Sequence, residues 1–311
     1  MMCLIEDYLF YIKDIRRYSP RTQAIYSDAL RDFADFSEAK TDGALLESLN
    51  RQTLRSYEVF LMENKGVGPR TVALHLSVLS GFCRFLMKEK RLAANPVRTV
   101  AKPKYEKRLP LFYREESMNE YFAVTDCDAS EENLVLITGS DKASEAAYSR
   151  RLERLIVSVL YSTGMRRAEL IGLRIGDVDF SRRTMTVRGK GDKVREIPLV
   201  PSLCKEISLY LQSVETMVGR TRSADEPLAV TGKGLKLYPV FVDRTVKKAL
   251  GQVGSITGRK SPHVLRHSLA TELLDEGADL NSIKELLGHS SLAATQVYTH
   301  NTIEKLKKVY V

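Results

Sequence analysis

The stretch Ile283–His300 reads IKELLGHSSLAATQVYTH and lies near the end of this 311-residue chain. Its first residues carry apolar side chains at helical spacing, and Gly288 then predicts the end of a short helix. His289 follows this glycine directly, and Tyr298 lies after a second helical turn. A tyrosine near a histidine is common, so the pair becomes informative only together with basic residues further upstream.

The chain is basic, with 48 Lys and Arg residues against 39 Asp and Glu residues and a formal net charge of +9. The positive excess is concentrated in the N-terminal third and in the segment that follows it, which favours a polyanionic partner such as DNA. Four scattered cysteines predict free thiols. The sequence has neither a secretory signal nor an apolar run near the roughly 20 residues that span a bilayer. We therefore expect a cytoplasmic protein without a membrane partner.

The sequence predicts two domains joined by a linker. Residues 1–100 carry apolar stripes at helical spacing, such as Leu54, Tyr57 and Leu61, which predict four or five helices around a core. Residues 101–110 are basic and contain two prolines, so they are expected either to follow a DNA backbone or to form an ordinary solvated linker. Residues 111–311 then form the second domain.

The second domain is expected to be mainly helical with a small β-sheet. Thr184–Arg188 and Val194–Leu199 alternate in polarity around a Gly-Lys-Gly segment, which predicts a hairpin with Lys190 in its turn. The later predicted helices are Pro201–Val218, Val242–Val253, His263–Glu276, Asn281–Leu287, Ala293–His300 and Ile303–Val309. A looser segment, Gly219–Tyr238, separates the first two, and the polar segment 125–147 is expected as a surface loop with an apolar tether at Leu134–Ile137.

Four basic residues upstream could bind a phosphate. His263 and Arg266 are three positions apart, so on a helix they share a face. Arg166 follows a tight turn at a helix N-terminus, where backbone N–H groups and the helix dipole favour anions. Lys190 on a hairpin could reach into a groove. Considered singly, each of these is more often a surface residue, and Tyr298 is more often a packing residue.

His263 and His267 also share a helix face, which raises the question of a zinc site. A metalloprotease helix needs glutamate directly after its first histidine, and Val264 occupies that position. The scattered cysteines offer no other cluster of ligands. We therefore expect no metal, and we expect His267 to be a packing or supporting residue.

One tyrosine, two arginines, one lysine and two histidines together are what metal-free phosphoryl transfer needs. A tyrosine with a pKa near ~10 is a weak nucleophile until its target is activated. Two guanidinium groups can hold the non-bridging phosphate oxygens and stabilise the crowded transition state. A lysine on a hairpin can then donate a proton to the leaving alkoxide.

At these residues the sequence resembles the tyrosine recombinase family, and most closely its Xer branch, which resolves chromosome dimers. The matching segments follow the family's order and approximate spacing and are Thr163–Leu170, Gly189–Lys193, His263–His267, Leu286–His289 and Val297–His300. The resemblance covers nearly the whole chain. It implies an N-terminal helical core-binding domain of SAM-like fold and a C-terminal recombinase catalytic domain.

The resemblance also implies a role for each matching residue. Tyr298 is expected to attack the scissile phosphate, join the DNA 3′ end and free a 5′ hydroxyl. Arg166 and Arg266 are expected to bind the phosphate, and Lys190 to protonate the leaving 5′ oxygen. The implied catalytic set is Arg166, Lys190, His263, Arg266, His289 and Tyr298.

His263 and His289 are implied to hydrogen-bond to the same phosphate, and Glu169 to support Arg166. No ATP, metal or other cofactor is expected, because the phosphotyrosyl bond conserves the energy of the broken bond. The implied partners are double-stranded DNA at a specific recombination site, an identical or sister recombinase in a tetramer that forms a Holliday junction, and a cell-division DNA translocase. The last predicted helix would dock on a neighbouring protomer, and the protein would be cytoplasmic and nucleoid-associated.

The sequence departs from the family pattern in two places. Ala168 stands where many relatives have serine, and the segment 125–147 is longer than in many relatives. A mobile-element integrase or a DNA invertase would share the same chemistry, although the compact length favours the Xer branch. A non-catalytic DNA-binding protein and a type IB topoisomerase are the remaining alternatives.

Overall fold

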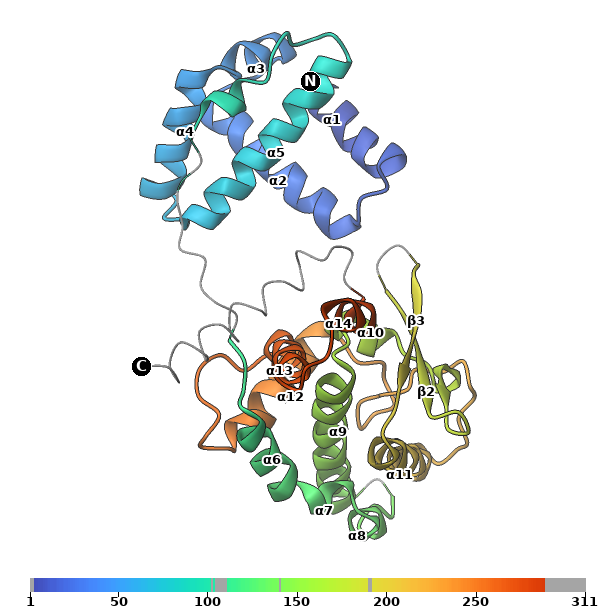
Figure 1. Cartoon of the computed structure of the whole chain (residues 1–311). Coiled ribbons are helices and arrows are strands. Elements are labelled where there is room, and N and C mark those ends of the chain that lie inside the picture. Colours follow the sequence, from blue (N-terminus) through green and yellow to red (C-terminus); the bar gives the residue numbers. More distant parts are fainter. Residues whose placement is uncertain (1–2, 102, 104–110, 140, 190–191, 289–311) are drawn as a thin grey trace, which may run out of the picture. The chain divides into compact units, whose positions relative to one another are not determined.

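The structure is a computed structural model that describes residues 3–101, 103, 111–139, 141–189 and 192–288 (Figure 1). The chain divides into two compact units, Met1–Lys107 and Arg108–Val311. None of the helices within the described ranges is long and apolar enough to cross a membrane. The predicted helices Ala293–His300 and Ile303–Val309 lie outside the described residues.

The N-terminal unit is built of helices joined by turns, as the apolar spacing predicted. Ser19 and Pro20 start the second helix: the Ser19 side chain accepts a hydrogen bond from the backbone N–H of Thr22, and Pro20 has the φ that a first helical residue needs. The elements are α1 Cys3–Phe10, the π-helical turn η1 Tyr11–Ile15, α2 Pro20–Phe36, α3 Asp42–Ser48, α4 Arg51–Glu63, α5 Pro69–Lys88 and η2 Pro96–Thr99.

Aromatic side chains pack among the aliphatic residues of the core of this unit, where α2 packs against α5. Tyr57 is fully buried and meets the ring of Phe33 edge-on at 5.1 Å between centroids. Its hydroxyl lies 2.9 Å from Nδ1 of His75, so the buried polar atom has a partner. Leu54 and Leu61 of the same helix are also buried, which confirms the predicted apolar face of α4.

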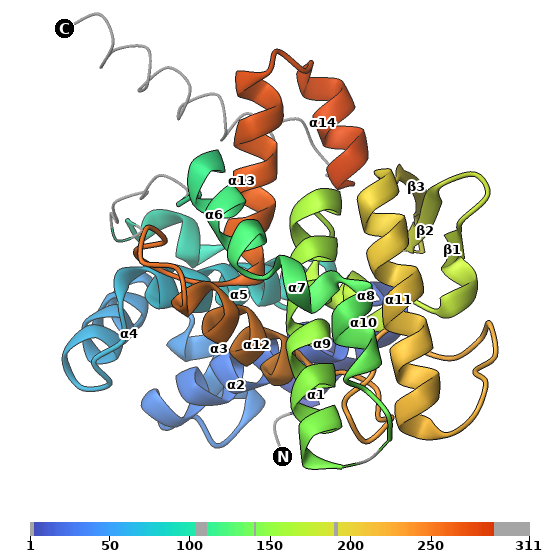
Figure 2. The same cartoon turned by 90° about the horizontal axis from the view of Figure 1, so that it is seen from below.

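The C-terminal unit is organised around the long helix α9, Lys142–Thr163, which contacts α11, α12 and α13. Figure 2 shows α11 on one side of α9 and α12 and α13 on the other. The other helices of this unit are α6 Glu115–Val124, α7 Asp126–Ala129, α8 Glu131–Val135, α10 Arg167–Gly172, η3 Ile175–Asp177, α11 Pro201–Val218, α12 Pro239–Gly251, α13 Pro262–Asp275 and α14 Leu280–Leu287.

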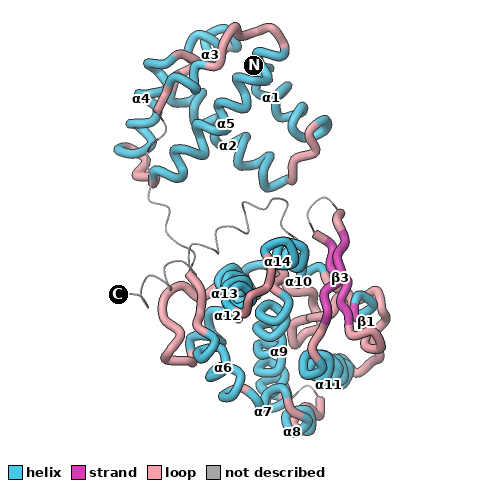
Figure 3. Tube along the Cα trace, in the orientation of Figure 1, coloured by secondary structure: helices cyan, strands magenta, loops and turns pink. Residues whose placement is uncertain are grey.

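Three short antiparallel strands form the small sheet of this unit, in the order β1-β2-β3 (Figure 3). They are β1 Val178–Asp179, β2 Thr184–Arg188 and β3 Val194–Pro198. The β2–β3 hairpin confirms the sequence prediction, and β1 is an additional strand. The mainly helical fold with a small sheet is therefore as predicted.

The predicted helix boundaries agree closely for α11 and differ slightly for α12 and α13. The structure starts α12 at Pro239 rather than at Val242, and α13 at Pro262 rather than at His263. Proline suits the first helical position because its N–H is missing where no partner exists. Both starts were therefore signalled by prolines that the apolar spacing alone did not include.

The segment 125–147 is not the surface loop that we expected, because it contains α7, α8 and the first turns of α9. Of the expected apolar tether, Ile137 is buried but Val135 and Leu136 are exposed. The segment is instead held by buried polar contacts. Arg151 of α9 donates from Nε to the side-chain oxygen of Asn133 at 3.0 Å.

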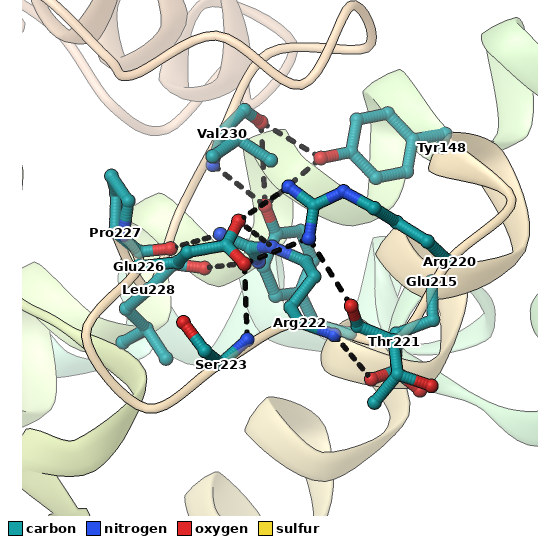
Figure 4. A network of polar contacts seen from close by, with 11 residues as sticks. Tyr148, Glu215, Arg220, Thr221, Arg222, Ser223, Glu226, Pro227, Leu228 and Val230 are labelled. Atoms are coloured by element: carbon teal, nitrogen blue, oxygen red, sulfur yellow. Dashed lines mark hydrogen bonds and ion pairs between the residues drawn. The ribbon is translucent and has the colours of Figure 1, made fainter.

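The loop after α11 is irregular, yet polar contacts fix it in place (Figure 4). Arg220 makes a two-pronged ion pair with Glu226, both hydrogen bonds measuring 2.8 Å. Arg222 is buried and donates to two backbone carbonyl groups of the same loop. The hydroxyl of Tyr148 in α9 donates to the carbonyl oxygen of Val230 at 2.7 Å. The loop is thus attached to the core helix α9 through Tyr148.

Candidate active site

The turn between α9 and α10 places Arg166. Helix α9 ends at Gly164, whose φ of 59° is in the left-handed region that favours glycine. A Cβ at this position would meet Leu287 Cδ2 at 2.5 Å and Leu269 Cδ2 at 2.9 Å. The glycine therefore allows α13 and α14 to pack directly against the turn.

Arg166 is the residue immediately before α10, and Glu169 closes the turn around it. The Glu169 carboxylate accepts one hydrogen bond from the backbone N–H of Arg166 and another from its Nη1, both at 2.8 Å. Nη2 of the same guanidinium donates to the carbonyl oxygen of Gly288 at 3.0 Å. The Arg166 side chain keeps 35% of its surface exposed, so it is held in place and still open to solvent.

Arg266 extends from α13 to the same place. It is buried, and it donates to the carbonyl oxygen of Gly164 at 2.5 Å and to that of Leu287 at 2.7 Å. Arg166 and Arg266, separated by 100 positions in the sequence, therefore bind the carbonyl groups of two consecutive residues, Leu287 and Gly288. The structure brings the two predicted phosphate-binding arginines together at the C-terminal end of α14.

A third arginine that the sequence analysis did not single out joins them. Arg195 of β3 donates to both carboxylate oxygens of Glu169, at 2.8 and 3.3 Å. Its Nε donates to the carbonyl oxygen of Leu286 at 2.8 Å. In the sequence Arg195 belongs to an alternating strand with charged neighbours, where nothing distinguishes it from a surface residue. Its burial depends on α14, which packs against β3.

These groups form what we call the arginine cluster, which consists of Arg166, Arg195, Arg266, Glu169 and the carbonyl groups of residues 286–288. Burial alone would raise the pKa of Glu169, but the hydrogen bonds from Arg195 and Arg166 outweigh it and lower that pKa. Three guanidinium charges thus face one carboxylate charge and neutral carbonyl groups. The negative end of the α14 dipole favours cations there, and the remaining positive charge suits an anionic ligand.

His263 lies in the first turn of α13, one turn before Arg266, and is exposed. Partial desolvation lowers its pKa, and the positive charges of Arg167, Arg266 and Arg259 lower it further. Its imidazole is therefore neutral at pH 7 and can both donate and accept a hydrogen bond. His263 and Arg266 lie on the same helix at the spacing that the sequence suggested.

His267 is half-buried one turn further along α13. Burial lowers its pKa to about 4, with smaller effects from His263 and Arg266. It too is neutral at pH 7. Nowhere in the described parts of the chain do three or more His, Cys, Asp or Glu side chains gather as a metal site would require.

Lys190, His289 and Tyr298 lie outside the described residues, so their predicted roles stay predictions. Two described glycines mark the ends of the neighbouring elements. Gly189 closes the base of the hairpin by donating to the carbonyl oxygen of Lys193 at 2.7 Å. Gly288 ends α14 with a φ of 65°. Both glycines border the arginine cluster, since a Cβ on either would lie within 4 Å of Arg195.

Comparison with known proteins agrees with this geometry. Residues 131–305 match the model of the phage integrase family, and residues 5–90 match that of the phage integrase N-terminal SAM-like domain. The tyrosine recombinase XerC of Chlorobaculum parvum is 34% identical over 314 residues, which cover 98% of this chain and 92% of that protein. The chain belongs to the phage integrase family. This confirms the resemblance to tyrosine recombinases and the expected class of enzyme.

A second relative is similar in sequence, and two solved structures share the fold. XerC of Bacillus subtilis is 34% identical over 310 residues, covering 99% of this chain and 94% of that protein. The XerH site-specific recombinase bound to a palindromic difH substrate has the same fold, with a TM-score of 0.74, 21% identity and coverage of 98% and 83%. The Tn1549 transposon integrase in complex with transposon right end DNA also shares the fold, with a TM-score of 0.67, 17% identity and full coverage of both chains.

The turn at Gly164 yields a first prediction. Gly164→Ala is expected to destabilise the protein more than Gly219→Ala, although both glycines end a helix with positive φ. The left-handed conformation costs alanine roughly 1–2 kcal/mol at either site. Only at Gly164 does the new methyl meet Leu287 and Leu269, adding about 1–3 kcal/mol of overpacking. Urea denaturation of both variants measures the difference, and equal losses would contradict the close packing of α14 on this turn.

Glu169 yields a prediction on pH dependence. Its pKa in the folded state is below the ordinary 4.5, so its ionised form stabilises the fold above pH 4.5 and this contribution is lost as pH falls through the lowered value. Glu169→Gln is therefore expected to cost about 2 kcal/mol near pH 7, and the difference from wild type is expected to disappear in acid. Chemical denaturation at a series of pH values measures it.

The control for this series is Glu196→Gln, which removes an exposed carboxylate paired with Arg182 on the same sheet. An exposed pair of this kind contributes roughly 0–1 kcal/mol. A loss of unfolding free energy in Glu169→Gln that does not change with pH would contradict the lowered pKa of Glu169. An equal loss in Glu196→Gln would show that the buried ion pairs contribute no more than an exposed one.

Proposed function

We propose that this chain is a site-specific recombinase that cuts DNA by attack of Tyr298 on a phosphodiester and rejoins it after strand exchange. The convergence of Arg166 and Arg266 on consecutive carbonyl groups is the observation that carries the proposal. Two fixed guanidinium groups at one point can hold both non-bridging oxygens of a phosphate. The neutral His263 beside them can add a hydrogen bond.

The proposed reaction is an in-line displacement at phosphorus. The Tyr298 hydroxyl gives its proton to the neutral imidazole of His263 as its oxygen forms a bond to phosphorus. The bond from phosphorus to the 5′ oxygen breaks, and the 5′ oxygen takes a proton from Lys190. Arg166 and Arg266 stabilise the charge on the non-bridging oxygens, and His263 and His289 hydrogen-bond to the same group. The 5′ hydroxyl of a partner strand reverses the step, so neither ATP nor a metal cofactor is needed.

Domain roles follow from the same proposal. Residues 1–100 would bind the core of the DNA site, residues 101–110 would follow the backbone as a basic linker, and residues 111–311 would carry the chemistry. The division of the chain into two compact units and its net charge of +9 support this assignment. Four protomers, identical or paired with a sister recombinase, would act on two sites through a Holliday junction.

The proposed physiological role is the resolution of chromosome dimers at cell division, in the cytoplasm at the nucleoid. It is supported by full-length similarity at about one-third identity to proteins named XerC. A cell-division DNA translocase would then be the activating partner. An integrase of a mobile element would use the same chemistry on a different DNA.

The proposed nucleophile gives a direct prediction. Incubation with a nicked DNA site that traps the intermediate is expected to give a covalent protein–DNA adduct on denaturing electrophoresis. Tyr298→Phe is expected to give no adduct, because it lacks the attacking oxygen. Tyr238→Phe, which changes an exposed tyrosine of the same unit, serves as the control and is expected to keep the adduct. An adduct from Tyr298→Phe would overturn the assignment.

The physiological role gives a separate prediction. Mapping the DNA bound in living cells, by crosslinking the Tyr298→Phe variant, is expected to give one chromosomal site. Deletion of the gene is expected to raise the fraction of dimeric chromosomes. Binding at the ends of a mobile element, with no change in chromosome dimers, would support an element-borne integrase instead.

A further inference from the structure

Arg195 is half-buried among residues of the site, yet none of the roles proposed above uses it. Its side chain is only 13% exposed, whereas that of Arg166 is 35% exposed. Each of its three guanidinium nitrogens already donates to a protein group, so Arg195 is poorly placed to receive a phosphate itself. Its hydrogen bonds are directed at protein groups, two to the carboxylate of Glu169 and one to the carbonyl of Leu286.

These contacts join three elements that are distant in the sequence. Arg195 belongs to β3, Glu169 to α10 and Leu286 to α14. Glu169 in turn fixes Arg166, so Arg195 acts on Arg166 through one intervening carboxylate. The Leu286 carbonyl is at the end of α14, next to the two carbonyl groups that Arg266 and Arg166 bind.

The Arg195 guanidinium is packed closely against the backbone at Gly288. A Cβ added at Gly288 would lie 2.9 Å from Nη1 and 3.2 Å from Cζ of Arg195. A side chain at 288 would therefore displace the guanidinium. The β2–β3 hairpin, by contrast, keeps its own register through the pairing of Val187 with Arg195 and of Arg188 with Val194. Loss of the Arg195 side chain thus affects the end of α14 and the Glu169–Arg166 pair more than it affects the hairpin.

We propose that Arg195 is a positioning residue for DNA cleavage. It holds the C-terminal end of α14 and the Glu169–Arg166 pair in one arrangement, and it does not touch the DNA. A guanidinium suits this role because its planar fork can donate to a carboxylate and to a carbonyl at the same time, whereas a lysine ammonium cannot span both. The inference rests on the proposed recombinase function and assigns a part of its machinery.

The test compares Arg195→Gln and Arg195→Lys in single-turnover cleavage of a trapping DNA substrate at saturating protein. We expect the cleavage rate constant of Arg195→Gln to fall on the order of 100-fold, since small misplacements of catalytic groups have effects of that size. DNA affinity is expected to stay within about twofold, because the proposed role of Arg195 involves no phosphate contact. Arg195→Lys keeps the charge and is expected to lose nearly as much rate.

The matched control is Arg182→Gln, in the exposed turn between β1 and β2. Arg182 pairs with Glu196, and its side chain is 64% exposed. It is expected to cleave at the wild-type rate. Thermal denaturation of each variant shows whether it is folded, and Arg195→Lys retains the charge and bulk that keep the site filled if Arg195→Gln does not fold.

A substrate with sulfur in place of the 5′ bridging oxygen separates positioning from proton donation. A thiol has a pKa near ~8.5, so a thiolate leaves without needing a general acid. Lys190→Ala is expected to recover on this substrate, and Arg195→Gln is expected not to recover. If Lys190→Ala also fails to recover, the general-acid assignment in the proposed function is wrong, and the effect of Arg195 is still judged by its own rate on ordinary DNA.

Four results would overturn the proposal for Arg195. Cleavage by Arg195→Gln within twofold of wild type would show that the arrangement does not depend on it. A defect that disappears at saturating protein would make Arg195 a DNA-binding residue. If Arg195→Gln cleaved the sulfur substrate at the wild-type rate, Arg195 would act on proton donation to the leaving group. If Arg195→Lys cleaved ordinary DNA at the wild-type rate, the positive charge alone would be sufficient.

Discussion

The C-terminal end of α14 is the constraint on which the rest of the candidate site depends. The last carbonyl groups of a helix have no partner within it and must find donors elsewhere. Here the donors are guanidinium groups from three distant parts of the chain: Arg195 binds the carbonyl of Leu286, Arg266 that of Leu287 and Arg166 that of Gly288. One helix end therefore fixes the positions of three positive charges. Gly164 makes this possible, since any larger residue there would meet Leu287.

The choice of acceptors decides what the cluster can do. Carboxylates would neutralise the arginines, whereas neutral carbonyl groups hold them in place without removing their charge. Glu169 is the carboxylate that the described residues place within the cluster, and it is shared between Arg166 and Arg195. The site is thus rigid and electropositive before any ligand arrives. Such preorganisation is what the stabilisation of a charged transition state requires.

Much of this could be predicted from the sequence. The spacing of His263 and Arg266, the glycine turn before Arg166 and the Gly-Lys-Gly hairpin are local patterns, and each is placed by local rules of helix and turn formation. Arg195 could not be found in this way, because its burial results from a tertiary contact between β3 and α14. The prediction of a loop at 125–147 is wrong for the same reason. The polar residues of this segment suggest a loop, but Arg151 of α9 donates a buried hydrogen bond to Asn133 and so satisfies one of these polar groups.

The central claim is that two arginines held by α14 act on the charge of a phosphate. The most direct measurement compares Arg166→Ala with wild type on ordinary DNA and on DNA whose scissile phosphate is replaced by an uncharged methylphosphonate. On ordinary DNA we expect the variant to cleave on the order of 1,000-fold more slowly, since a preorganised donor to a developing charge has an effect of that size. On the uncharged substrate the difference is expected to shrink to about tenfold or less, because one non-bridging oxygen no longer carries charge. An equal loss on both substrates would contradict the account.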